Sequence, residues 1–175
     1  MLQKISFIII FIFIFYSTVF ANDNYISFLT YGHGKDSILK HQQKEKQIMY
    51  GFEYGIKLPD YKRLWVTFEA AYSTHEHTDV DNSFLIKCWG LYKSDSWNKF
   101  NIYSGIGVGL STYKDNDLVK RCPSASLGLR AGLEYLLTED VSINAEYAYE
   151  HNSGMWIDDR GRNIDFVKVA VKYYF

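Results

Sequence analysis

The chain has 175 residues, which is enough for one domain. Its formal net charge is −1, so the sequence predicts no broad electrostatic attraction to nucleic acid and no nucleic-acid partner. Aromatic residues make up 18% of the chain, and 15 residues are tyrosine. Beyond the N-terminal segment no apolar run is long enough for a transmembrane helix, which excludes a membrane protein with several helical spans.

The N-terminal segment has the features of a secretory signal peptide. A basic start is followed by an apolar run over about residues 5–15, and Val19 and Ala21 form a small-x-small cleavage pattern. The run is short for a membrane anchor, which is the alternative interpretation. We therefore predict a signal peptide over residues 1–21 and one domain over residues 22–175. An exported chain rich in Tyr and Gly is typical of an outer-membrane β-barrel.

Alternation with a period of two residues runs through the rest of the chain, and this pattern predicts β-strands. In FNIYSGIGVGL, for example, Phe100, Ile102 and Ile106 share one face, and the glycines occupy the other. Eight strands are expected, at about residues 25–33, 46–58, 63–74, 83–93, 98–113, 123–137, 141–153 and 163–175. Short turns alternate with longer polar connections, as expected for periplasmic turns and external loops.

The two faces of these strands favour a barrel with lipid outside over a soluble periplasmic β-protein. The apolar faces are long enough to cross a thin bilayer obliquely. The other faces mix small residues with charges of both signs, which would pair inside a narrow lumen filled by side chains. The charged residues expected there are Glu53, Glu69, Glu134, Glu146, Lys57, Lys87, Arg130 and Lys168. The predicted fold is all-β, an eight-stranded antiparallel transmembrane β-barrel in the bacterial outer membrane. The terminal Phe175, which follows an alternating strand, resembles the C-terminal signature of such barrels.

Three polar residues extend apolar faces at the external ends of the last two strands. Along YAYEHNSG, Tyr147 and Tyr149 are expected to face lipid, and His151 and Ser153 have the same parity. Asp165 has the parity of the apolar residues of the last strand. A serine nucleophile needs a base within hydrogen-bond reach, and a carboxylate can orient a histidine base. The alternative is that these are ordinary polar residues at the headgroup ends of two strands.

With this spacing the chain resembles the outer-membrane lipid A 3-O-deacylases, the PagL-like acyloxyacyl hydrolases. That family is an eight-stranded barrel with a late His-x-Ser motif and an acid twelve positions after the Ser. The resemblance implies Ser153 as nucleophile, His151 as general base and Asp165 as the residue that orients His151. It implies hydrolysis of the 3-position ester of lipid A, the lipid of lipopolysaccharide, without a metal or an organic cofactor.

Two positions depart from the family pattern. The acid is Asp165, where the family usually has Glu, and Gly154 follows the serine, where the family usually has an Asn linked to the oxyanion hole. The Gly154 backbone N–H and the Asn163 side chain are the candidate oxyanion donors. The alternative function is a non-enzymatic barrel, structural or adhesive, that acts through its external loops, and a homodimer is left open.

Several other motifs have ordinary interpretations. GIGVG at 105–109 lacks the helix and the Lys-Ser/Thr of a nucleotide-binding loop, and HEH at 75–77 lacks a further set of metal ligands. Cys88 and Cys122 either pair as exported cysteines or stay unpaired. Lys35, Lys40, Lys44 and Lys46 either contact lipopolysaccharide phosphates or belong to a solvated loop.

Overall fold

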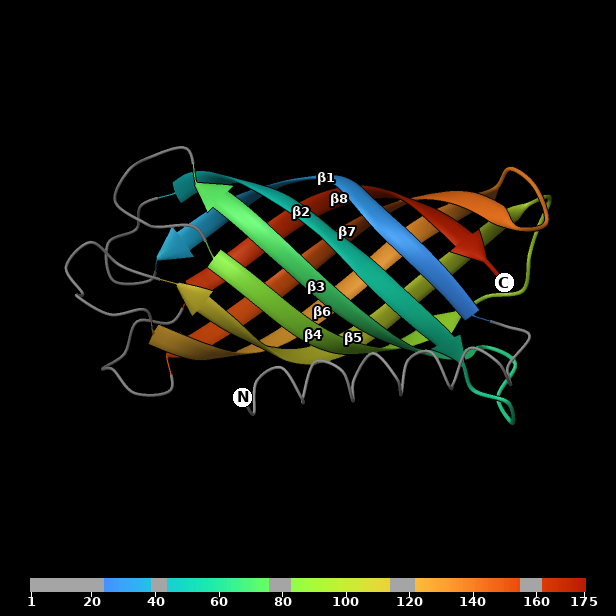
Figure 1. Cartoon of the computed structure of the whole chain (residues 1–175), viewed down its shortest axis with the longest axis horizontal. Coiled ribbons are helices and arrows are strands. Elements are labelled where there is room, and N and C mark those ends of the chain that lie inside the picture. Colours follow the sequence, from blue (N-terminus) through green and yellow to red (C-terminus); the bar gives the residue numbers. More distant parts are fainter. Residues whose placement is uncertain (1–23, 39–43, 76–82, 114–121, 155–161) are drawn as a thin grey trace, which may run out of the picture.

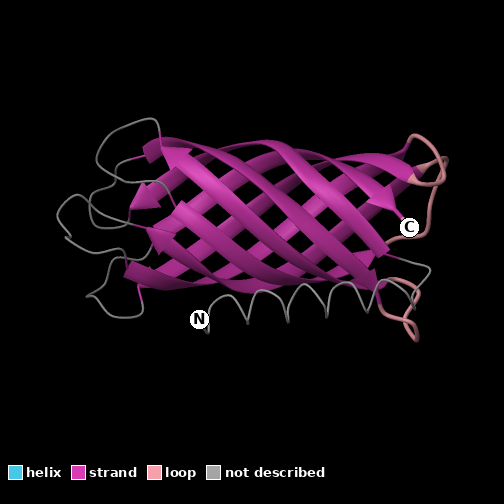
Figure 2. Ribbon diagram, viewed as in Figure 1, coloured by secondary structure: helices cyan, strands magenta, loops and turns pink. Residues whose placement is uncertain are grey.

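The computed structural model describes residues 24–38, 44–75, 83–113, 122–154 and 162–175, with side chains described for 24–28, 48–74, 83–112, 124–153 and 163–175. These residues form eight antiparallel strands that pair in chain order, and β8 pairs with β1 to close the barrel (Figures 1 and 2). The strands are β1 Asn24–Ile38, β2 Lys44–Lys57, β3 Leu64–His75, β4 Ser83–Lys93, β5 Phe100–Tyr113, β6 Cys122–Leu136, β7 Val141–Gly154 and β8 Arg162–Tyr174. The predicted closed barrel is therefore confirmed. Within these ranges, no helix is long and apolar enough to cross a membrane.

The strand boundaries agree with the predicted ones to within two residues, except in β1, which continues to Ile38 instead of ending near residue 33. The cause is a β-bulge. The register of β1 shifts between Leu29 and Tyr31 against β8, and between Leu29 and Gly32 against β2. An extra residue at a bulge exchanges the two faces of the strand beyond it, so the alternation in the sequence is interrupted there.

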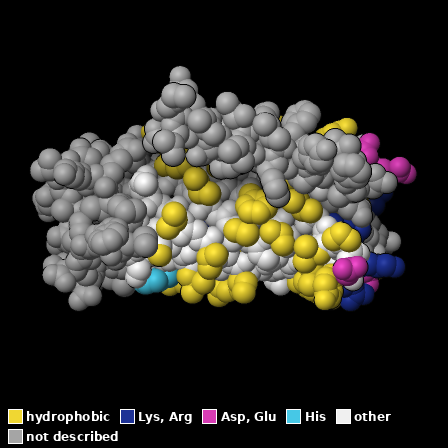
Figure 3. Space-filling view, turned by 60° about the horizontal axis from the view of Figure 1, so that its bottom comes forward, with side chains coloured by type: hydrophobic (Ala, Val, Ile, Leu, Met, Phe, Trp, Pro, Cys, Tyr) yellow, Lys and Arg dark blue, Asp and Glu magenta, His cyan; other side chains and the backbone are white. Residues whose placement is uncertain are grey.

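The outer wall of the barrel is apolar. Side chains that a soluble protein would bury are more than half exposed, including Ile106 at 66%, Val108 at 61% and Leu127 at 60%. Figure 3 shows apolar side chains spread over the visible wall, with charged side chains gathered at one end. In water such a surface would associate or aggregate, whereas it is the expected surface of a barrel that crosses a lipid bilayer.

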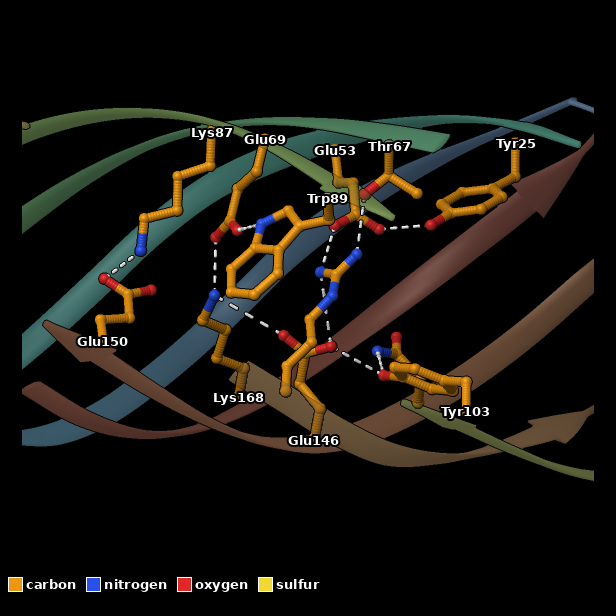
Figure 4. A network of polar contacts seen from close by, with 12 residues as sticks. Tyr25, Glu53, Thr67, Glu69, Lys87, Trp89, Tyr103, Glu146, Glu150 and Lys168 are labelled. Carbon is orange, nitrogen blue, oxygen red and sulfur yellow. Dashed lines mark hydrogen bonds and ion pairs between the residues drawn. The ribbon is translucent and has the colours of Figure 1, made fainter. Parts of the chain in front are cut away.

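The lumen is filled by side chains around Trp89, which is fully buried (Figure 4). The ring needs two glycines beside it. A Cβ atom on Gly107 would lie 2.4 Å from ring carbons of Trp89, and one on Gly128 would lie 2.6 Å away. Two of the predicted glycine positions therefore give the indole its space, and the indole closes the middle of the barrel.

Buried charges surround Trp89 and pair across the lumen. The Lys168 ammonium lies 2.7 Å from Oε1 of Glu69 and 3.6 Å from Glu146, and the indole N–H of Trp89 donates to the other oxygen of Glu69 at 2.8 Å. Arg130 forms ion pairs with Glu53 and Glu146, and donates to Thr67. Further pairs join Lys87 to Glu150 and Lys93 to Glu134. The predicted pairing of luminal charges is confirmed for Glu53, Glu69, Glu146, Arg130 and Lys168. Lys87 and Glu134 are paired as well, but with Glu150 and Lys93, which lie outside the predicted set. Each of these buried charges gains the partner that its desolvation requires.

Candidate functional site

The predicted site residues lie at the external ends of β7 and β8, where the apolar outer wall ends. Ser153 is exposed and His151 is half-buried, whereas Asn152 between them is buried toward the lumen. His151 and Ser153 thus share the outward face with Tyr147 and Tyr149, as the parity of the strand predicts.

His151 is held from the neighbouring strand by Asn163. The two residues are directly opposed in the β7–β8 register, and Nδ1 of the imidazole lies 2.7 Å from Oδ1 of the Asn163 amide. Because an amide oxygen only accepts, this contact assigns the proton to Nδ1 and leaves the lone pair on Nε2. Nε2 is the nitrogen that a general base would use.

Asp165 follows Asn163 by two positions on the outward face of β8, further from the external end, and its side chain has a different partner. It is opposed to Tyr149, and its carboxylate accepts a hydrogen bond from the Tyr147 hydroxyl at 2.5 Å. The structure therefore brings Asn163 to the His151 ring and Asp165 to Tyr147. The sequence predicts Asn163 only as an oxyanion donor, and its position beside the imidazole depends on the strand register.

Ser153 and Gly154 complete the end of β7. Ser153 is opposed to Ala125 of β6, and Gly154, the last residue of the strand, is opposed to Ser124. Among the described side chains, no hydrogen bond joins the Ser153 hydroxyl to His151. The Cα atoms of residues two apart on a strand are about 6–7 Å apart, so Ser153 and His151 are neighbours on this face.

A shallow hollow of about 770 Å³ runs along the outer wall below this site. Its lining includes Tyr147 and Tyr149 of β7, Leu129 and Ala131 of β6, and Ile106 of β5. The hollow begins two residues from His151 on the same face and is nearly all apolar, so it is suited to hydrocarbon.

The described side chains contain no group of three or more His, Cys, Asp or Glu placed to hold a metal ion. The side chains of the HEH stretch lie outside the described residues. Cys88, on the outward face of β4, carries a free thiol, so the considered disulfide is not formed there.

A closed barrel of eight antiparallel strands, with a charged lumen and an apolar outer wall, defines the class of small outer-membrane β-barrels. The family model for the outer membrane protein beta-barrel domain matches residues 9–175, so the chain belongs to this family and to the bacterial outer membrane. No curated protein matches the sequence.

Solved structures with the same fold include several small barrels. Neisserial surface protein A is 18% identical with a TM-score of 0.74, and the match covers 87% of this chain and 97% of that one. The outer membrane enzyme PagL is 14% identical with a TM-score of 0.58, covering 86% and 99%. OprG from Pseudomonas aeruginosa is 17% identical with a TM-score of 0.56, covering 89% and 96%. The likeness to PagL is thus one of several and establishes the fold.

Proposed function

We propose that this barrel is an esterase of the outer leaflet that hydrolyses the 3-position ester-linked hydroxyacyl chain of lipid A. One observation carries the proposal. At the lipid-facing surface, Asn163 holds Nδ1 of His151 at 2.7 Å, and Ser153 follows His151 on the same face. A histidine with a fixed tautomer beside an exposed serine is the minimum arrangement for nucleophilic ester hydrolysis.

In the proposed reaction Ser153 Oγ attacks the ester carbonyl carbon while Nε2 of His151 takes the hydroxyl proton. The tetrahedral intermediate collapses when the bond to the sugar oxygen breaks, and His151 gives its proton to that oxygen. A water molecule, deprotonated by His151, then attacks the acyl-serine. The 3-hydroxy fatty acid leaves as the acyl–Oγ bond breaks, and His151 returns the proton to Ser153 Oγ. Asn163 keeps Nδ1 protonated and accepts its hydrogen bond while the ring is charged. The Gly154 backbone N–H is the proposed oxyanion donor.

The position of the residues relative to the membrane supports a lipid substrate. An ester of an outer-leaflet lipid lies at the level where apolar side chains give way to polar ones, and His151 and Ser153 lie at this level. An acyl chain extending from that ester would enter the hollow lined by Tyr147 and Tyr149. Asp165 then has an indirect role, because its bond to the Tyr147 hydroxyl fixes one side of the hollow.

A second candidate function is a non-enzymatic barrel that acts through its external loops. One observation favours it: Asp165, at the acid position of the deacylase pattern, bonds to Tyr147 and not to His151. On this alternative, the His151–Asn163 bond only stabilises the end of the β7–β8 pair.

Mass spectrometry of lipid A from outer membranes that contain the protein distinguishes the two candidate functions. We expect the wild type to remove one hydroxyacyl chain, and Ser153→Ala and His151→Ala to leave lipid A intact. Ser96→Ala is the control, because Ser96 is an exposed serine between β4 and β5, away from the hollow. Heat-modifiable migration confirms that each variant is inserted. An unchanged acyl count with an inserted wild type would exclude the esterase, and chain loss that survives Ser153→Ala would exclude the residue assignment.

A further inference from the structure

The hollow in the outer wall lies between two rows of outward side chains and crosses the strands from β7 to β3. Residues directly opposed in the strand register make up each row. The row nearer the external end consists of Tyr149, Leu129, Ile106, Gly90 and Val66, and the other consists of Tyr147, Ala131, Ser104, Tyr92 and Leu64. Leu91 and Arg130 lie between the rows and also line the hollow, although their side chains are buried in the lumen. The backbone of the sheet therefore forms the floor of the hollow.

Three small residues keep the hollow open. Gly90, Ser104 and Ala131 stand among larger apolar side chains, and a Cβ atom on Gly90 would meet no other atom within 4 Å. The strands that the hollow crosses span four spacings of about 4.8 Å, so it is roughly 19 Å long. One leaflet contributes about 15 Å to the hydrocarbon core, so the hollow can hold one acyl chain over its full length.

The hollow reaches the periplasmic end of the barrel. Its end there is lined by Leu58 and Leu64, which flank the short turn between β2 and β3. Its opposite end, at Tyr147 and Tyr149, is the part that the proposed substrate chain would enter from the outer leaflet. A lipid of the inner leaflet would enter at Leu58 and Leu64, because its headgroup lies at the level of the periplasmic turns.

Charged side chains of both signs stand at this end of the hollow, and Figure 3 shows such side chains gathered at one end of the barrel. Arg63, next to Leu64, donates from Nη1 to the hydroxyl of Tyr92 at 2.9 Å and from Nε to the carboxylate of Asp95 at 3.1 Å. Tyr92 belongs to one row of the hollow, so the Arg63–Asp95 ion pair is directly beside the apolar surface. Both side chains of the pair remain accessible, with 49% of Arg63 and 74% of Asp95 exposed.

An exposed ion pair beside an apolar hollow complements a zwitterionic phospholipid. The phosphate of such a lipid can accept charge-assisted hydrogen bonds from Arg63, and its ammonium group can donate to Asp95. A purely anionic headgroup would gain the first contact but would be repelled by the carboxylates of Asp95 and of Asp60 in the β2–β3 turn.

We infer that the hollow binds one acyl chain of an inner-leaflet phospholipid and that Arg63 and Asp95 hold its zwitterionic headgroup. The chain lies across β3 to β6, which leaves the part of the hollow on β7 to the proposed substrate. His151 and Ser153 take no part, so the inference does not depend on the proposed function.

The test uses the full mature barrel in detergent micelles and native mass spectrometry. Its two probes have the same acyl chains: phosphatidylethanolamine, which is zwitterionic, and phosphatidylglycerol, which is anionic. We expect one phosphatidylethanolamine per barrel, bound about tenfold more tightly than phosphatidylglycerol, as one additional charged hydrogen bond would give. Equal binding of the two lipids, or tighter binding of phosphatidylglycerol, would overturn the headgroup assignment.

Gly90→Phe places a ring in the open space of the hollow and should weaken binding of both lipids by about threefold to tenfold, because the chain loses its contacts with the floor. Ser104→Leu fills the hollow at a second position and should have the same effect. Ala70→Phe, on the outward face of β3 outside the hollow, is the matched control and should leave binding unchanged. Heat-modifiable migration confirms that each variant is folded. Wild-type binding by both filling variants would show that lipid covers the wall without a defined site, and would overturn the inference.

The headgroup contacts are tested separately. Arg63→Gln/Asp95→Asn should bind both lipids equally, whereas Gly90→Phe should keep the preference for phosphatidylethanolamine at lower affinity. Lys99→Gln/Glu139→Gln changes two exposed residues of opposite charge outside the ion pair and should keep the wild-type preference. A preference that survives in Arg63→Gln/Asp95→Asn would overturn the role of the ion pair.

Discussion

Nδ1 of His151 and Oδ1 of Asn163 lie 2.7 Å apart across the β7–β8 pair, where the lipid-facing wall of the barrel ends. This bond fixes both the tautomer and the plane of the ring. It also makes the catalytic proposal testable at a residue that neither attacks the ester nor accepts its proton.

If Asn163 positions His151, Asn163→Ala should lower kcat for ester release by about tenfold to a hundredfold while KM changes little, because the base loses its orientation. Asn163→Asp should keep most of the activity, since a carboxylate also accepts from Nδ1. The measurement is steady-state release of hydroxy fatty acid in micelles. Equal loss in both variants, or none in either, would contradict the positioning role.

The luminal ion pairs should contribute to stability only as intact pairs. Lys168→Met leaves Glu69 and Glu146 without a shared cation, and we expect a loss of about 3–5 kcal/mol in the free energy of unfolding. Lys168→Met/Glu69→Gln should lose less than the single variant, because one unpaired charge is removed with it. Urea unfolding in lipid vesicles measures both. A double variant that loses more than Lys168→Met would show that the carboxylate does not depend on this lysine.

Gly107 of β5 and Gly90 of the neighbouring β4 should respond differently to substitution by alanine. Gly107→Ala places a Cβ atom 2.4 Å from the ring of Trp89, so we expect a loss of about 1–3 kcal/mol from overpacking. Gly90→Ala meets no atom within 4 Å and should be close to neutral. The same unfolding experiment compares them, and a neutral Gly107→Ala would mean that the indole can move aside.

The free-energy cost of placing a charge on the outer wall should depend on how deep that position lies in the bilayer. Ile106→Arg, at a position that is 66% exposed in the middle of β5, should cost about 2–4 kcal/mol of unfolding free energy in vesicles. Leu137→Arg, beside the short β6–β7 turn, should cost about 0–1 kcal/mol because its side chain reaches the interface. Equal costs would place Ile106 outside the hydrocarbon region.

The fold could be predicted from the sequence because each strand crosses the membrane with one apolar and one polar face. Ile106, Leu127 and Val167 lie on the outer wall as their parity predicts, and Glu69 pairs with Lys168 as the luminal charge pattern predicts. Parity is a local property, so each strand reveals it independently. Among the described strand pairings the face alternation is interrupted in β1, where the bulge after Leu29 exchanges the faces.

The partner of His151 could not be predicted because it depends on register. If the last residue of β7, Gly154, were opposed to the first residue of β8, Arg162, then His151 would be opposed to Asp165. In the observed register the residue opposite His151 lies two positions earlier in β8, and it is Asn163. A shift of two residues keeps every side chain on the same face of the sheet. The position of Trp89 at the centre of the lumen could not be predicted either, because it depends on glycines contributed by β5 and β6.

The seam between β1 and β8 joins the two ends of the described chain. The backbone N–H of Asn24 donates to the carbonyl of Phe175 at 3.2 Å, and the N–H of Phe175 donates to the carbonyl of Asn24 at 3.0 Å. Among the described residues these contacts have the greatest sequence separation, so they form only after β8 has joined the sheet. Until then the growing sheet has two unpaired edges that can recruit other strands. A chain truncated before β8 would therefore keep unpaired edges on β1 and β7, and we expect it to be prone to aggregation.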